Sequence, residues 1–163
     1  MRKYHVAFWA MLAVTAAAAP ALAQDAPAIA AKETFVNLYA PGSTYWGSAA
    51  PPARILAELQ QHLNDLGAYY HAKAQQTATT ETASRQADFL KAAAWYRKTI
   101  EIFPGTPQTA ATSMLCADAL YDGGQTEAAA QQYTQTAYAY AGNPKAAEAA
   151  YAAVQAWQRL THE

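Results

Sequence analysis

The chain has 163 residues, a formal net charge of −1 at neutral pH, and a composition in which 53% of the residues are hydrophobic and 14% are charged. This length suits one domain with its own core, and a charge so close to zero provides no basic field for nucleic acid or for an anionic lipid surface. The single cysteine, Cys116, excludes an internal disulfide and is expected to be a small buried residue.

Residues 1–23 have the pattern of a secretory signal peptide. Two basic residues follow the first methionine, residues 6–19 form an uncharged and mostly apolar run, and an Ala-Leu-Ala sequence ends at Ala23. The alternative is an uncleaved anchor, but the run is shorter than the ~20 apolar residues that span a bilayer, and Pro20 interrupts it. We therefore expect cleavage after Ala23, a periplasmic or secreted product, and no membrane insertion after cleavage.

Residues 24–51 are expected to form an extended segment in two parts. Residues 24–34 show no clear period, which predicts a mobile tail. Residues 35–51 hold several aromatic side chains and the pair Pro41-Gly42, which forbids a continuous helix. Two interpretations of these rings stay open: they pack over the helical body as an ordered strap, or they form an exposed docking element.

Residues 52–76 are predicted to form an amphipathic helix, and residues 77–86 a polar linker. Apolar side chains in the first of these segments recur at alternating spacings of three and four, which is the period of an apolar seam on a helix. They are Leu56, Leu59, Leu63, Leu66 and Tyr70. The seam predicts packing against the rest of the chain; a homo-oligomer seam is the alternative.

Residues 87–163 show a partial internal repeat with a period of 37 residues. Five pairs of identical residues carry it: Ala92 with Ala129, Tyr96 with Tyr133, Thr99 with Thr136, Pro107 with Pro144, and Ala110 with Ala147. Self-similarity at this period is typical of helical repeat arrays. Proline and glycine divide the segment into four helices with short connections, so neighbouring helices are expected to be antiparallel.

These residues resemble the tetratricopeptide repeat (TPR) family. The positions that carry the resemblance and would pack successive helices are Phe89, Ala92, Tyr96, Ala117, Leu120, Ala129, Tyr133 and Trp157. Alternating small and large residues let antiparallel helices approach closely. The sequence departs from the family in two ways. Ser113 occupies the position of the family's tryptophan, and the period of 37 residues differs from that of the family. It is similar to the looser repeats of bacterial envelope proteins such as the TolA-binding cell-division coordinator.

The resemblance implies an all-α fold in which antiparallel helical hairpins stack as a short TPR-like solenoid, preceded by the amphipathic helix. It also implies a concave groove that takes a peptide or helix of another protein. Carried over by position, the groove would be lined by Ala111, Met114, Asp118, Tyr121, Glu148, Tyr151, Gln155 and Gln158. The implied function is a protein-binding scaffold or adaptor in the cell envelope.

No pattern in the sequence predicts catalysis, a cofactor or a metal site. The histidines are not placed at i, i+3 or i+4 from one another, and no glycine-rich phosphate loop is present. The alternative to an adaptor is a structural, oligomerising subunit or the first part of a longer array, because the outer face of the last helix, with Tyr151, Val154 and Trp157, would otherwise be left partly bare.

Overall fold

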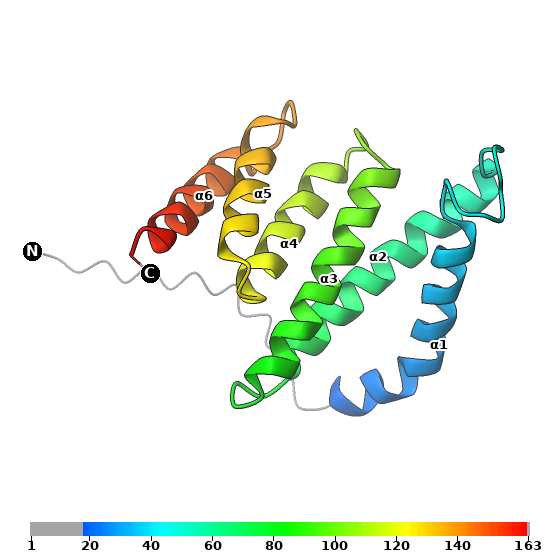
Figure 1. Ribbon diagram of the computed structural model, residues 1–163, viewed down its shortest axis with the longest axis horizontal. Coiled ribbons are helices and arrows are strands. Elements are labelled where there is room, and N and C mark those ends of the chain that lie inside the picture. The colour runs from blue at the N-terminus through cyan, green and yellow to red at the C-terminus, as the bar shows by residue number, and fades with distance from the viewer. Residues whose placement is uncertain (1–17, 163) are drawn as a thin grey trace, which may run out of the picture.

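The computed structural model describes residues 18–162, with side chains from residue 26 onward, and all regular structure in this range is helical. The helices are α1 (Ala18–Tyr39), α2 (Ala53–Gln76), α3 (Thr82–Ile102), α4 (Thr109–Asp122), α5 (Thr126–Tyr138) and α6 (Ala146–Leu160). Each packs against the next one along the chain, and together they form a row (Figure 1). The predicted all-α fold is confirmed. Residues 1–17 lie outside this range, so the expected signal peptide stays a prediction.

The breaks between the last four helices fall close to where proline and glycine predicted them. Gly124 has a φ of 79°, in the left-handed region that glycine adopts without strain. The N–H of the following Gln125 donates to the carbonyl of Leu120 at 2.8 Å, which satisfies a carbonyl in the last turn of α4. The connection to α5 is therefore a tight turn, and the two helices lie against each other.

The apolar seam of α2 is buried inside the chain. Leu59, Leu63 and Leu66 are fully buried and Tyr70 nearly so, because α1 covers one side of the helix and α3 the other. The prediction of packing against the rest of the chain is confirmed, and the seam is not available to a second copy.

Gly67 lies within this buried face and lets α3 approach α2 closely. An ideal Cβ on Gly67 would lie 2.4 Å from Cε1 of Tyr96, whose ring therefore fills the space that any larger residue would need. Tyr96 is itself only 5% exposed. A small residue on one helix thus accepts a large ring from the next helix.

The mobile tail predicted for residues 24–34 is wrong, because these residues belong to α1. Ile29 and Val36 are seven residues apart, so they return to the same face of the helix, and both are buried. Tyr70 donates a hydrogen bond to Glu33 at 2.8 Å, and Lys32 forms an ion pair with Asp65. These contacts with α2 order a segment whose own sequence period is weak.

The aromatic residues at the junction of α1 and α2 mostly pack. Phe35 lies edge-on to the ring of His62 on α2, with centroids 4.9 Å apart, and the indole N–H of Trp46 donates to the carbonyl of Tyr39 at 2.9 Å. Tyr45 stacks edge-on against Trp46 but remains 61% exposed. The ordered strap describes these rings best, although Phe35 and Tyr39 belong to α1 rather than to an extended chain.

The predicted polar linker, residues 77–86, is shorter than expected, because α3 already begins at Thr82. Side-chain contacts with the end of α2 hold the first turns of α3. Lys73 forms an ion pair with Asp88 at 2.9 Å, and the ring of His71 lies edge-on to the ring of Phe89, with centroids 5.4 Å apart. Tertiary packing therefore outweighs the weak helix propensity of the threonine-rich sequence.

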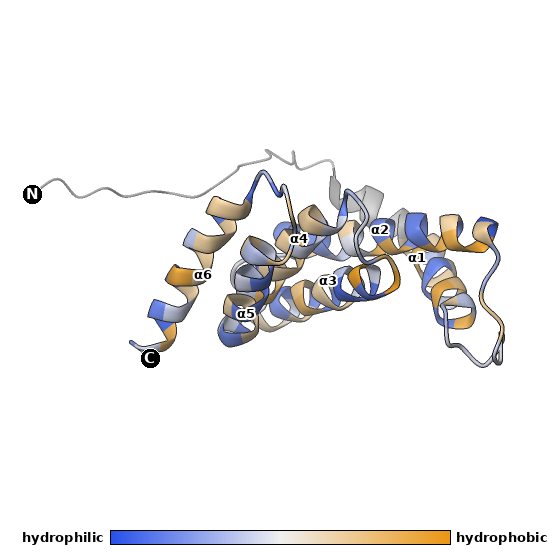
Figure 2. Ribbon diagram, turned by 90° about the horizontal axis from the view of Figure 1, so that it is seen from above, coloured by the Kyte–Doolittle hydropathy of each residue, from blue (hydrophilic) through white to orange (hydrophobic). Residues whose placement is uncertain are grey.

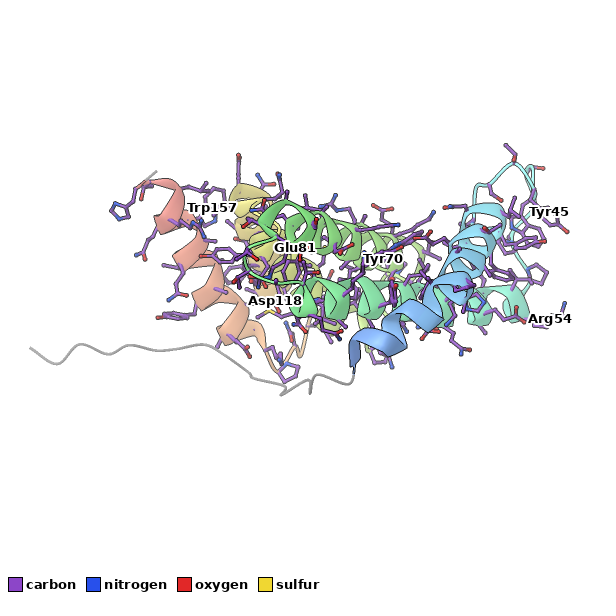
Figure 3. All side chains as sticks on the ribbon, turned by 90° about the horizontal axis from the view of Figure 1, so that it is seen from below. Tyr45, Arg54, Tyr70, Glu81, Asp118 and Trp157 are labelled. Carbon is purple, nitrogen blue, oxygen red and sulfur yellow. The ribbon has the colours of Figure 1, made fainter. Side chains whose placement is uncertain are left out.

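The residues predicted to pack successive helices are buried, with one exception. Phe89, Ala92, Tyr96, Ala117, Leu120, Ala129 and Tyr133 all lie in the core. Trp157 is 42% exposed, so its assignment as a packing residue is wrong. It lies at the opposite end of the row from Tyr45, on α6, which packs against α5 on one side only (Figure 3).

Polar and sulfur-bearing side chains complete the packing between α3, α4 and α5. The hydroxyl oxygens of Ser113 and Thr136 are 2.6 Å apart, and the amide of Gln132 donates to Ser113 at 2.7 Å. Cys116 is fully buried, as predicted, with its sulfur 3.5 Å from the carbonyl oxygen of Ala93. Burial raises the pKa of the Cys116 thiol to about 11, so the thiol stays protonated at neutral pH.

Candidate partner groove

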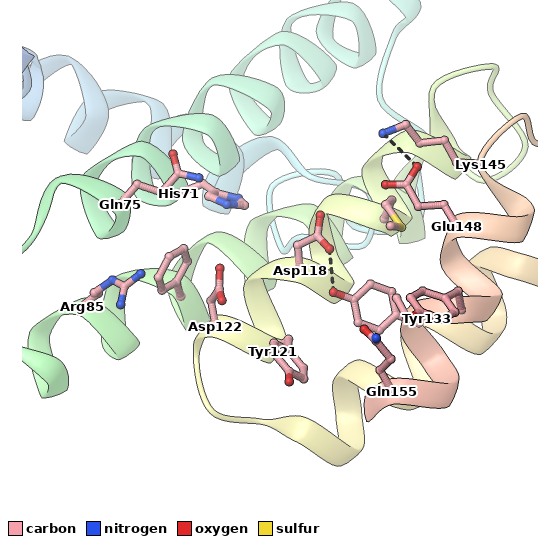
Figure 4. A pocket seen from close by; sticks show the side chains of 14 residues that line it. His71, Gln75, Arg85, Asp118, Tyr121, Asp122, Tyr133, Lys145, Glu148 and Gln155 are labelled. Atoms are coloured by element: carbon pink, nitrogen blue, oxygen red, sulfur yellow. Dashed lines mark hydrogen bonds and ion pairs between the residues drawn. The ribbon is translucent and has the colours of Figure 1, made fainter. Parts of the chain in front are cut away.

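A groove of about 440 Å³ lies over α4, and side chains of the helices from α2 to α6 form its walls (Figure 4). We call it the α4 groove. Its volume is within the range of pockets that hold small ligands or a few side chains of a bound peptide. Its lining is mixed: it contains aromatic rings, carboxylates, amides and two basic side chains.

The floor of the groove comes from one face of α4. Met114, Asp118, Tyr121 and Asp122 are spaced by four, three and one residues, so they lie along one stripe of the helix. Met114 is buried, Asp118 and Tyr121 are half-buried, and Asp122 lies at the edge. The stripe therefore brings two carboxylates, one helical turn apart, into the lining of the groove.

Asp118 is held in place from α5. The hydroxyl of Tyr133 donates to its Oδ1 at 2.6 Å. Burial raises the pKa of the Asp118 carboxyl, and the hydrogen bond from Tyr133 lowers it; the charges of Asp122 and Glu148 raise it, while Lys145 lowers it. The net shift is upward, because the desolvation of the carboxylate outweighs its one hydrogen bond. Burial and the same carboxylate also raise the pKa of Tyr133.

The two basic side chains of the lining already have partners. Arg85 stacks on Phe89, and its charge lowers the pKa of Asp122, although desolvation raises that pKa overall. Lys145 forms an ion pair with Glu148 at 3.8 Å on the opposite wall. Within residues 18–162, neither Asp118 nor Asp122 has a basic side chain within ion-pair distance. The centre of the groove is therefore negative.

The far walls add rings and amides. Tyr151 and Gln155 of α6 line one wall, and Tyr151 is 54% exposed. His71 and Gln75 of α2 line the other wall. Burial lowers the pKa of His71, so its ring is neutral at neutral pH and adds no positive charge to the groove.

The structure brings together most of the residues that the resemblance to the TPR family placed in a groove. Met114, Asp118, Tyr121, Glu148, Tyr151 and Gln155 all line it. Ala111 and Gln158 are exposed and lie outside the lining. The resemblance missed the α2 and α3 side of the groove, including His71 and Arg85. It assigned groove positions only to α4 and α6, and no feature of the sequence showed which face of α2 would lie opposite α4.

Comparisons with protein-family models, curated proteins and solved structures find no match to this chain. Among the described residues, no three histidine, cysteine, aspartate or glutamate side chains are grouped so that they could hold a metal ion, and no helix is long and apolar enough to cross a membrane.

Proposed function

We propose that this chain is a TPR-like interaction module that binds a segment of another protein in the α4 groove and acts as a scaffold or adaptor in the cell envelope after export. The observation that carries the proposal is the groove: a concave surface that combines an exposed ring, Tyr151, with polar groups that converge on its floor. Such a lining suits a peptide, because rings give contact area while carboxylates and amides orient the chain.

The repeat pattern supports the TPR-like interpretation. Tyr96 of α3 and Tyr133 of α5, which are related by the period, are both buried rings that face the preceding helix. Thr99 and Thr136 are buried in the same two helices, and each donates its hydroxyl to the carbonyl four residues earlier. Residues at one repeat distance thus have similar environments, which is the expectation for stacked repeats.

The test is capture of a partner by purified protein from an extract of the periplasm, compared between variants. Tyr151→Ala removes an exposed ring of the groove, and Tyr121→Ala removes a second ring. Tyr45→Ala is the matched control, because Tyr45 is 61% exposed and lies outside the groove. We expect the two groove variants to lose a partner that the control retains, with unchanged helicity by circular dichroism. A partner retained equally by all the variants would refute the proposed groove.

Self-association is the second candidate function, and one surface favours it. Tyr138 and Trp157 line a shallow hollow between α5 and α6, and Val154, one turn before Trp157, is 53% exposed. The helix α6 mixes hydrophobic and hydrophilic residues along its length (Figure 2). Light scattering at rising concentration tests this candidate: Trp157→Ala should reduce any dimer, and a strict monomer would refute it.

A further inference from the structure

The centre of the α4 groove has more negative charge than its own cations neutralise. Of the three carboxylates in the lining, only Glu148 forms an ion pair, with Lys145. Arg85 acts on Asp122 through its charge but stacks on Phe89. Asp118, the most central of the three, has the neutral hydroxyl of Tyr133 as its hydrogen-bond donor. A cation that enters the groove therefore meets an unneutralised carboxylate.

The geometry of that carboxylate fits a donor from outside the chain. Tyr133 occupies Oδ1 of Asp118 and fixes the orientation of the group. Within residues 26–162, no hydrogen bond engages Oδ2. Figure 4 shows Asp118 and Asp122 pointing into the same space between the walls of the groove. Two carboxylates one turn apart can together accept several N–H groups from one planar donor.

Two aromatic rings of the groove lining, Phe89 and Tyr121, already have arginine side chains stacked on them. Arg85 lies over Phe89 at 5.2 Å, and Arg159 lies over Tyr121 at 5.4 Å. Guanidinium binds carboxylates in a fork and stacks on aromatic faces, and it is more weakly hydrated than an ammonium group, so its transfer into a half-buried site costs less. Tyr151, which is 54% exposed on the opposite wall, offers a further ring at the entrance.

We propose that the segment bound in the α4 groove inserts an arginine side chain, whose guanidinium is held by Asp118 and Asp122 and stacks on a ring of the groove wall. This inference rests on the proposed function, because it names the chemistry of the segment that the groove takes. The amides of Gln75 and Gln155, on the two sides of the floor, are placed to hydrogen-bond the main chain of that segment.

The experiment uses two synthetic peptides that differ in one group. The first is acetyl-Ala-Leu-Arg-Leu-Ala-amide; in the second, citrulline replaces arginine, which keeps the shape but removes the charge. Each is titrated into isotopically labelled protein, and binding is followed by amide chemical shifts. We expect the arginine peptide to shift amides of α4 and α6 and to bind at least about tenfold more tightly than the citrulline peptide, since it makes charge-assisted hydrogen bonds.

Two variants complete the design. Asp118→Asn should weaken the arginine peptide about tenfold and leave the citrulline peptide unchanged. Glu127→Gln removes one exposed negative charge from α5, outside the groove, and should change neither affinity. The midpoint of thermal unfolding should not fall in Asp118→Asn, because burial disfavours the charged form of this carboxyl in the folded protein.

The outcomes separate this inference from the proposed function. The inference would be overturned by equal binding of both peptides or by no binding of either. It would also be overturned if Asp118→Asn left the affinity for the arginine peptide unchanged. If a partner is still captured in a manner that depends on Tyr151, the groove remains a protein-binding site with a different specificity. If the arginine peptide binds as expected but no partner is captured, the inference stands and the adaptor function fails.

Discussion

The close approach of α2 and α3 predicts the effect of replacing Gly67 by alanine. The new Cβ would lie 2.4, 2.6 and 3.1 Å from three carbon atoms of the Tyr96 ring, whereas non-bonded carbon atoms normally sit 3.5–4.0 Å apart. The ring cannot easily move, because it is 5% exposed and its hydroxyl lies 3.4 Å from Nδ1 of His71. The helices must therefore separate, or Tyr96 must leave its rotamer.

The size of the effect follows from two opposing terms. Overpacking a core costs typically about 1–3 kcal/mol, and a contact more than 1 Å too short belongs at the upper end of that range. Alanine has a higher helix propensity than glycine, which offsets roughly 1 kcal/mol. We expect Gly67→Ala to lower the free energy of unfolding by about 2 kcal/mol, measured by urea denaturation followed by circular dichroism.

The same substitution made in a Tyr96→Ala protein separates the steric cost from the gain in helix propensity. In Tyr96→Ala protein the ring is absent, so Gly67→Ala should stabilise by roughly 1 kcal/mol through helix propensity alone. The difference between the two backgrounds measures the steric coupling of the pair. If Gly67→Ala stabilises the otherwise unchanged protein, the ring of Tyr96 does not fill this space and the described packing of α2 on α3 is wrong.

Two further predictions concern the α4–α5 interface. Ser113→Ala should lower the free energy of unfolding by about 1–3 kcal/mol, because it leaves the Gln132 amide without its acceptor in a partly buried site, whereas the Thr136 hydroxyl keeps its bond to the Gln132 carbonyl; urea denaturation measures this, and an unchanged midpoint would show that water reaches the site. Asp118 has a raised pKa in the folded state, so its contribution to stability is present below the ordinary aspartate pKa of 3.8 and is lost as the pH rises through the folded value. Asp118→Asn should therefore lose less stability between acid and neutral pH than the unchanged protein. Burial also raises the pKa of Asp122, which adds to the loss in both proteins, and burial lowers the pKa of His71, which opposes it. Parallel pH profiles for the two proteins would contradict this assignment.

Much of the fold could be predicted because local patterns decide it. Alternating spacings of three and four specify which face of α2 is apolar, and glycine and proline specify where α3, α4 and α5 end. The repeat of Ala92 and Tyr96 at Ala129 and Tyr133 identified buried positions, because a small residue and a ring at fixed spacing are needed wherever antiparallel helices approach closely. Along one face of α4 and α6, the resemblance to the TPR family placed Asp118 and Tyr151 in the groove.

The parts of the fold that could not be predicted from the sequence depend on which helix surfaces meet. Residues 24–34 show no clear apolar period in the sequence, and contacts with Asp65 and Tyr70 of α2 hold this part of α1 in place. From the sequence alone, Gly67 is expected only to lower the helix propensity of its segment. The ring of Tyr96 shows that Gly67 is a packing position. A sequence pattern states which face of a helix is apolar, but burial is a property of two surfaces. The second surface, and with it the α2 wall of the α4 groove, was decided by the tertiary structure.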